Sequence, residues 1–339
     1  MDSVALLREL IAIPGPAGQE SLVRDALASH VEAMGYAHET DAKGNFLVQI
    51  GEGAIDLVVT AHMDEIAMIV RRIEPDGRIV VASLGGLFPW KIGEGPVEIL
   101  ASEPISGILS FGSIHTEDPS STVRKLDTSA LKWDMARVFT GLTVEQLEDC
   151  GVRPGTRVVV ARSRRKLTNV NDLVAGYFLD DRADLVSWLL ALEELQEHDV
   201  NALFVATAAE EVGGEGALFL LHELRPSICI ALELGPNVPD APVKITDQPT
   251  VWANDGYSAM SAADGDLVAR IGRDLGMNLQ FQALSRGGSD ASCAAGHGLC
   301  ARPITLGLAM ENSHGYEIMH PRAMDNLARL TVALVKELA

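Results

Sequence analysis

The chain has 339 residues, of which 47% are hydrophobic and 22% are charged, so it can form a large folded core and is neither disordered nor fibrous. Its 27 basic and 47 acidic residues give a net charge of −20, which argues against nucleic acids and anionic membranes as partners because both bind basic surfaces. No apolar run approaches the roughly 18–20 residues of a membrane span. Because Asp2 stands where a secretion signal carries basic residues and the four cysteines are scattered, we expect a cytoplasmic protein.

The first part of the chain combines helical and strand patterns. Helical periodicity predicts one helix over Val4–Ile11 and another from about Gln19 to Gly35, with a Pro- and Gly-rich segment between them. Phe46–Ile50 follows a turn and is expected to be a strand. Asp56–Ala61 is an apolar run of strand length, which is typical of a strand covered on both faces.

From about residue 70 to residue 165 the pattern changes to short β-rich runs separated by Gly, Pro and Asp turn signals. These runs are Ile79–Ala82, Val97–Leu100, Gly107–Phe111 and Thr156–Ala161. Thr143–Cys150 is the one convincing helix among them. We therefore predict a β-rich inserted domain at residues 69–165, which divides an α/β domain into residues 1–68 and 166–339.

After the insert, helical and strand patterns alternate again. The expected helices are Ala183–Leu195, Gly216–Leu224, Asp264–Leu275 and Arg322–Leu338, and the expected strands are Ala202–Ala208, Ser227–Leu232 and Ala301–Leu306. This alternation is typical of an α/β fold with a mostly parallel sheet sandwiched by helices.

Side chains that can bind metal ions follow several of these strands, and active sites of α/β proteins lie at that edge of the sheet. They are His62 and Asp64, Glu210 and Glu211, Glu233, His314, and the Asp180-Asp181 pair that opens a helix. Each motif alone is weak, because a single His-x-Asp or Glu-Glu pair is usually structural. Five such elements in order, each with suitable chemistry, are far more specific.

A charge count favours two metal ions at this place. Asp180, Glu211 and Glu233 contribute three negative charges, and His62 and His314 are neutral ligands, so two divalent cations would leave +1, which a bridging hydroxide cancels. Without cations, gathered carboxylates would repel one another and lose solvation. Two ions about 3.5–4 Å apart would lower the pKa of a bridging water towards 7.

The motifs in this order resemble the co-catalytic metallo-aminopeptidases of the tetrahedral (TET) or deblocking type, a family that includes glutamyl aminopeptidase and members often labelled endoglucanase. The resemblance covers nearly the whole chain and rests on His62–Ile66, Leu179–Arg182, Glu210–Gly213, Glu233 and His314. The position of the insert agrees with this family, because related di-zinc carboxypeptidases and deacylases carry their extra domain after the Glu-Glu pair.

The resemblance implies a di-zinc exopeptidase-like fold and two divalent metal ions per subunit, with Zn²⁺ expected and Co²⁺ or Mn²⁺ possible. Asp180 would bridge the ions. The remaining ligands would be His62 and Glu233 at one ion and Glu211 and His314 at the other. Glu210 would be the general base and Asp64 would orient His62. Two further questions stay open. His320 competes with His314, although His314 follows the strand sooner. The segment Arg286–Asp290 either belongs to the site or is only a loop before a helix.

For the whole protein, the resemblance implies an aminopeptidase that hydrolyses N-terminal residues of peptides through a metal-bridged hydroxide. The insert would be a barrel or PDZ-like dimerisation domain, and dimers would assemble into a hollow dodecamer. Two alternatives remain. A related metallohydrolase would act on N-acyl or other amide substrates, whereas a glycosidase, as the endoglucanase labels suggest, would need two carboxylates and no metal.

Overall fold

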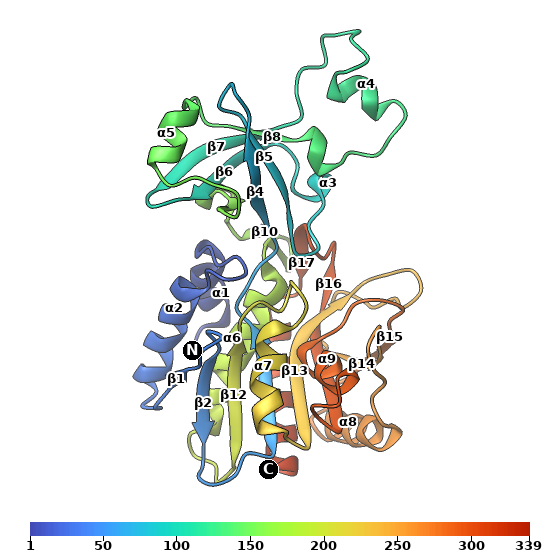
Figure 1. Ribbon diagram of the computed structural model, residues 1–339. Coiled ribbons are helices and arrows are strands. Elements are labelled where there is room, and N and C mark those ends of the chain that lie inside the picture. The colour runs from blue at the N-terminus through green and yellow to red at the C-terminus, as the bar shows by residue number, and fades with distance from the viewer.

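The computed structural model describes residues 1–339 and contains two units, an α/β unit and a smaller β-barrel (Figure 1). The α/β unit is built on an 11-stranded mixed sheet with helices on both faces, and the barrel is closed by six strands. The predicted fold class, an α/β domain with an all-β barrel inserted, is therefore confirmed. The domain limits at residues 69–165 remain a prediction, and the first barrel strand begins at Ala67.

Four neighbouring strands form the parallel centre of the sheet. Their order is β12 (Ala202–Thr207), β3 (Leu57–His62), β13 (Ile228–Pro236) and β16 (Arg302–Glu311). Nearly every residue in them is buried, as expected for apolar strands covered on both faces. Two of them are longer than the sequence pattern predicts, since β13 continues past Leu232 and β16 past Leu306.

Antiparallel pairs extend this centre at both edges, so the parallel arrangement is confined to the middle of the sheet and to one branch. The edge strands are β1 (Glu39–Thr40) and β2 (Phe46–Ile50) on one side, and β17 (Tyr316–Met319), β11 (Leu173–Tyr177) and β10 (Thr168–Val170) on the other. A branch from β16 consists of β14 (Thr250–Asn254) and β15 (Gln280–Ala283), which pair in parallel with each other. Except for β2, these strands were not predicted, because they are short and mostly only half apolar.

Helices cover both faces of the sheet, and the alternation of side chains along β3 separates the two hydrophobic layers. Leu57, Val59 and Ala61 point into a core of 51 buried residues, and Val58 points into one of 13. The larger core contains residues from α1 (Ser3–Ala12), α2 (Ser21–Ala33), α6 (Leu179–Leu195), α8 (Ala262–Asp274) and α10 (Ala323–Leu338). The smaller core contains residues from α7 (Glu215–Leu224) and α9 (Asp290–Gly296).

The barrel has its own core of 17 buried residues, most of them Val, Ile or Leu. Its strands lie in the order β4 (Ala67–Ile73), β5 (Ile79–Leu84), β8 (Arg137–Phe139), β7 (Pro104–Ser110), β6 (Gly95–Leu100) and β9 (Arg157–Val160). Between them lie the short helices α3 (Pro89–Ile92), α4 (Thr122–Leu126) and α5 (Val144–Asp149) and the 3₁₀ turns η1 (Trp133–Met135) and η2 (Arg162–Arg164). The closed barrel leaves no free strand edge in this unit.

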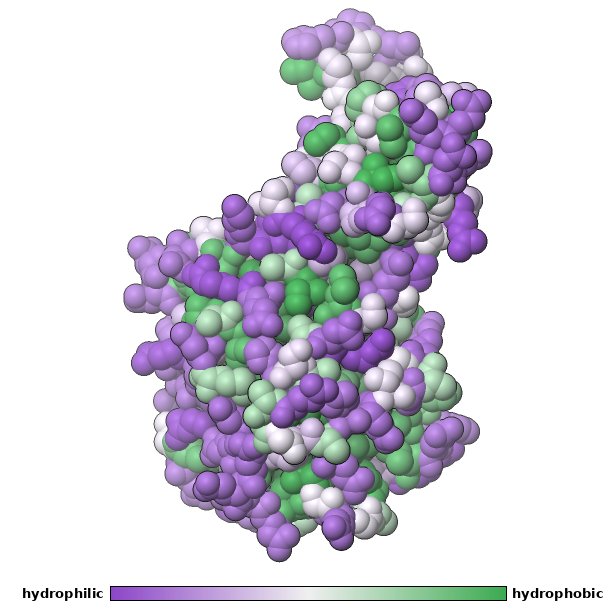
Figure 2. Space-filling model, turned by 90° about the vertical axis from the view of Figure 1, so that its left-hand side faces the viewer, coloured by the Kyte–Doolittle hydropathy of each residue, from purple (hydrophilic) through white to green (hydrophobic).

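The surface of the molecule is mainly hydrophilic, with apolar side chains gathered in patches on the barrel and where the two units meet (Figure 2). None of the helices combines the length and the apolar character needed to cross a lipid bilayer. The cytoplasmic location expected from the sequence stays a prediction.

Candidate metal centre

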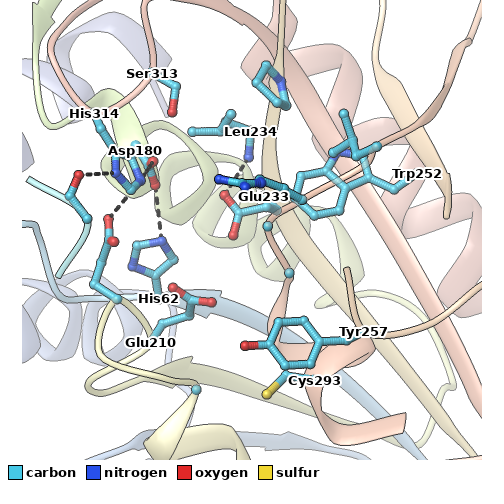
Figure 3. A pocket seen from close by; sticks show the side chains of 18 of the residues that line it. His62, Asp180, Glu210, Glu233, Leu234, Trp252, Tyr257, Cys293, Ser313 and His314 are labelled. Carbon is cyan, nitrogen blue, oxygen red and sulfur yellow. Dashed lines mark hydrogen bonds and ion pairs between the residues drawn. The ribbon is translucent and has the colours of Figure 1, made fainter. Parts of the chain in front are cut away.

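A pocket of about 360 Å³ opens where the parallel strands end and the barrel begins (Figure 3). The five predicted metal ligands and Glu210 all line it, although they come from five separate segments of the chain. His62 is the last residue of β3, and Glu233 lies within β13. Asp180 is at the start of α6, Glu210 and Glu211 follow β12, and His314 is in the turn between β16 and β17.

Asp180 lies between two clusters of potential ligands. Its Oδ1 atom is 3.1 Å from Nε2 of His62, and its Oδ2 atom is 3.5 Å from Nε2 of His314. In one cluster, ligand atoms of His62, Asp180, Asp181 and Glu233 all lie within 4.8 Å of one another, and in the other the same holds for Asp180, Glu211 and His314. A carboxylate whose two oxygens face two different imidazoles has the geometry of a bridging ligand.

The electrostatics of the pocket favour positive ions. Burial raises the pKa of Glu210, Glu211 and Glu233 well above the usual range, and nearby carboxylates raise it further. Burial alone would lower the pKa of His62, but the carboxylates around it, Asp181 first, raise it well above its ordinary value. Divalent cations would replace the protons that these acids otherwise retain. Imidazole and carboxylate donors fit such ions.

Asp64 lies behind the pocket and holds the Glu210-Glu211 segment through its backbone. Its two carboxylate oxygens accept hydrogen bonds from the N–H groups of Glu210 (2.8 Å) and Glu211 (3.1 Å). Nδ1 of His62 is 3.1 Å from the carbonyl oxygen of Asp64 and 3.4 Å from its Oδ1. Asp64 therefore contacts His62 and also positions the backbone of the two glutamates, whereas its role in orienting His62 stays a prediction.

Glu317, on β17, is a residue that sequence reasoning missed. It is 1% exposed, and its carboxylate accepts hydrogen bonds from the backbone N–H groups of Asp180 (3.1 Å) and His314 (2.9 Å). Burial, followed by the charge of Asp180, raises the pKa of Glu317 to about 8. The spacing of a Glu three residues after the candidate His was the only sequence signal available. Glu317 thus joins the backbones of two candidate ligands that are far apart in the chain.

We expect Glu317→Gln to weaken metal binding by about 10–100-fold, the usual range for residues that support metal ligands. The amide offers one acceptor oxygen, and its NH₂ group would face the second backbone N–H, so one candidate ligand loses its anchor. Calorimetric titration of metal-free protein with Zn²⁺ measures the effect. Glu223→Gln, at an exposed position on α7, is the matched control. Equal affinity in the Glu317 variant and the control would refute this positioning role.

The barrel contributes directly to the pocket through the segment after β5. Nδ1 of His314 lies 3.1 Å from the carbonyl oxygen of Gly86, so a proton on Nδ1 would be donated there and would leave Nε2 free for a metal. Nζ of Lys91 donates to Oδ1 of Asn312 (2.7 Å) and to the carbonyl of Ser313 (3.0 Å). The turn that carries His314 is therefore held by two residues of the barrel.

We expect Gly86→Ala to displace the His314 ring, because the added Cβ would lie 2.6 Å from its Nδ1 and 2.7 Å from its Cε1. Metal affinity should fall by about 10–100-fold, as when other groups that orient metal-binding histidines are lost. Calorimetric titration of the metal-free protein with Zn²⁺ again measures the effect. Gly265→Ala is the control, because its new methyl group would meet only the end of Met260, at 3.5 Å. Unchanged affinity in Gly86→Ala would mean that the barrel contact does not orient His314.

The structure also locates His320 and the segment Arg286–Asp290, whose roles the sequence left open. His320 does not line the pocket, and its Nδ1 accepts a hydrogen bond from the N–H group of Arg322 (3.3 Å). Arg286 lines the pocket, whereas Asp290 begins α9 and accepts a hydrogen bond from Oγ1 of Thr207 (2.7 Å). The loop at 286–290 therefore both borders the pocket and leads into a helix.

Comparison with known proteins places the chain in a family. The chain is 27% identical to lysyl aminopeptidase of Pyrococcus furiosus over 232 residues, which cover 68% of this chain and 65% of that protein, slightly less than two thirds of its length. It is 24% identical to glutamyl aminopeptidase of Lactococcus lactis over 238 residues, covering 68% of this chain and 66% of that one. The TET1 peptidase of Pyrococcus horikoshii, described as able to assemble into a tetrahedron or a large octahedral shell, has a similar structure. Its TM-score is 0.88 at 24% identity, over 99% of this chain and 100% of that chain.

The family model described as M42 glutamyl aminopeptidase matches residues 44–330, a range that contains every predicted site residue. The family resemblance predicted from the motifs is thereby confirmed. This chain belongs to the M42 glutamyl aminopeptidase family.

Proposed function

We propose that this protein is a metallo-aminopeptidase that removes N-terminal residues from peptides. The observation that carries the proposal is the pair of donor clusters that share Asp180, beside Glu210, in a pocket at the end of the parallel strands. Membership of the M42 family supports a peptide substrate over the other amides considered. The histidines in the donor clusters disfavour a glycosidase, which needs two carboxylates and no metal.

The donor set supports two divalent cations, with Zn²⁺ expected and Co²⁺ or Mn²⁺ compatible. Asp180 would contact both ions, His62 and Glu233 would complete one site, and Glu211 and His314 the other. When bound, the ions supply a polarised scissile carbonyl and a more acidic attacking water. The charges agree with this number of ions, because three ligand carboxylates would leave two dications with only +1.

Glu210 is the proposed general base. It would take a proton from the attacking water and pass it to the nitrogen of the departing amine, so that the carbon–nitrogen bond breaks with a neutral leaving group. The hydrogen bond from its N–H group to Asp64 keeps its backbone in place during this transfer. The acidic pocket attracts the positively charged α-amine of a peptide, which favours substrates with a free N-terminus.

The barrel, assigned to residues 69–165, is the proposed dimerisation domain, and a dodecamer built from dimers is the proposed assembly. Exposed apolar side chains on this unit support self-association. Phe88 and Trp90 are 55% and 58% exposed and stack on each other with ring centres 5.8 Å apart. A hollow assembly of this kind would limit substrates to unfolded peptides.

Hydrolysis of aminoacyl-p-nitroanilides tests the proposed reaction. We expect metal-loaded protein to release p-nitroaniline, chelation with EDTA to abolish release, and added Zn²⁺ or Co²⁺ to restore it. If no free-amine substrate is cleaved by protein that binds two metal ions, the peptidase proposal fails. Activity on N-acyl amino acids would then indicate a deacylase, and EDTA-resistant cleavage of β-glucans would indicate a glycosidase.

A further inference from the structure

One wall of the pocket carries a positive charge that the proposed chemistry does not use. Apart from the five candidate ligands and Glu210, the charged residue that lines the pocket is Arg286. Its guanidinium makes no hydrogen bond or ion pair with the rest of the chain, and the residue is exposed. This guanidinium is therefore free to bind a ligand that enters the pocket.

The backbone that carries Arg286 is held on both sides, although the side chain is free. Oγ of Ser285 donates to Oδ2 of Asp240 (2.8 Å), and the carbonyl of Gly287 accepts a hydrogen bond from the N–H group of Gly256 (3.0 Å). Gly288 packs so closely on the ring of Tyr257 that a Cβ there would lie 2.4 Å from it. The position of Arg286 at the pocket is therefore determined by the surrounding structure.

Several apolar residues line the pocket together with Arg286. Leu284 and Trp252 belong to one small buried hydrophobic cluster, and Leu234, Pro236 and Tyr257 also line the pocket. Trp252 and Tyr257 lie across the pocket from His314, Asp180 and His62 (Figure 3). The pocket thus has one side suited to metal ions and another that combines apolar surface with a single cation.

We propose that this second side binds the side chain of the substrate's N-terminal residue and that Arg286 selects a carboxylate, so that the enzyme prefers N-terminal Glu or Asp. The inference rests on the proposed aminopeptidase function. A guanidinium forms paired, charge-assisted hydrogen bonds with a carboxylate, and apolar walls strengthen them by excluding water. Family membership leaves this preference open, because the relatives are described as lysyl and glutamyl aminopeptidases.

The cation also opposes the lysyl preference, because an N-terminal Lys side chain would bring a second positive charge towards Arg286. The acidic cluster does not reverse this expectation. Two divalent cations would offset most of the negative charge of the candidate ligands, which weakens the attraction of that side of the pocket for an N-terminal Lys side chain.

The test compares kcat/KM for the p-nitroanilides of Glu, Asp, Leu and Lys. We expect the wild-type protein to favour Glu or Asp, and Arg286→Gln to lower the Glu-to-Leu ratio by about 10–100-fold, as expected for loss of a charged hydrogen-bonding partner. Arg286→Glu should move the preference towards Lys. Arg273→Gln, which removes one exposed charge from the end of α8, should leave the ratio at its wild-type value. An unchanged ratio in Arg286→Gln, or a wild-type preference for Lys, would overturn the inference.

The C-terminal carboxylate of a short peptide is a second group that could bind the Arg286 guanidinium. The p-nitroanilides lack that group, so they report only on the N-terminal side chain. If Arg286 instead binds a C-terminus, Arg286→Gln will slow cleavage of Leu-Ala but not of Leu-Ala amide, and will leave the p-nitroanilide ratios unchanged. That outcome would reject the side-chain assignment.

Measurements of peptide binding test this inference independently of the proposed reaction. Calorimetry with the metal-loaded Glu210→Gln variant compares Glu-Ala with Leu-Ala, which share the same C-terminus, and repeats the comparison with Arg286→Gln added. If no p-nitroanilide is cleaved, the proposed reaction fails, but tighter binding of Glu-Ala that depends on Arg286 would still support the selection of acidic residues. Equal binding of both peptides would reject it.

Discussion

Glu210→Gln will lower kcat/KM for aminoacyl-p-nitroanilides by about 10²–10⁴-fold, the contribution typical of general acid–base catalysis. Glutamine has the same shape but cannot accept the proton of the attacking water. The hydrogen bond from the backbone N–H group of residue 210 to Asp64 does not depend on the side chain, so the local structure is retained. Initial rates at saturating Zn²⁺, with metal content measured on the same sample, give the result.

If Glu210 is the general base, the Glu210→Gln variant will lose activity but retain its bound metal ions. Glu211→Gln provides the contrast, because it alters a candidate ligand that lies 3.6 Å from Nε2 of His314 and should lose metal as well as activity. Activity of Glu210→Gln within about threefold of wild type would place the general base elsewhere. Loss of metal in Glu210→Gln would show that this residue acts as a ligand.

Glu65→Ala will lower the free energy of unfolding by about 3–5 kcal/mol, the range for breaking a buried ion pair. Glu65 lies between Arg165 and Arg182, and the side chains of all three residues are fully buried. Its Oε2 accepts hydrogen bonds from Nη1 of Arg165 (2.9 Å) and Nη2 of Arg182 (3.1 Å). Removing the carboxylate would leave two buried guanidinium groups without their counter-charge.

This cluster also connects the two units. Glu65 lies two residues before the first barrel strand, Arg165 follows the last one, and Arg182 lies two residues after Asp180. Chemical denaturation followed by tryptophan fluorescence measures the loss. Glu337→Ala is the matched control, because it breaks an exposed pair with Arg270 that is expected to contribute no more than about 1 kcal/mol. A loss in Glu65→Ala no greater than in the control would refute the role of the cluster.

The sequence alone was sufficient for the features that depend on local pattern. The apolar runs of β3 and β12 predicted buried parallel strands, because a strand covered on both faces has no polar alternation. The short β-rich runs after residue 70 predicted a β-rich insert, and the family resemblance suggested a barrel or PDZ-like form for it. The family could be recognised because its motifs are short stretches of sequence that follow predicted strands in a fixed order. Their recognition does not require knowledge of their positions in space.

Tertiary structure decided the features that depend on contacts between distant segments. The edge strands β10, β11 and β17 have only three to five residues each, and their burial ranges from fully exposed in β10 to mostly buried in β11. Their pairing is therefore determined by the neighbouring strand more than by their own pattern. The contacts from Glu317 to Asp180 and from Gly86 to His314 join residues 137 and 228 positions apart. Arg286 likewise acquires its place in the pocket from the fold. The chain pattern records which side chains are present and their local periodicity, whereas only the packed structure determines which of them meet.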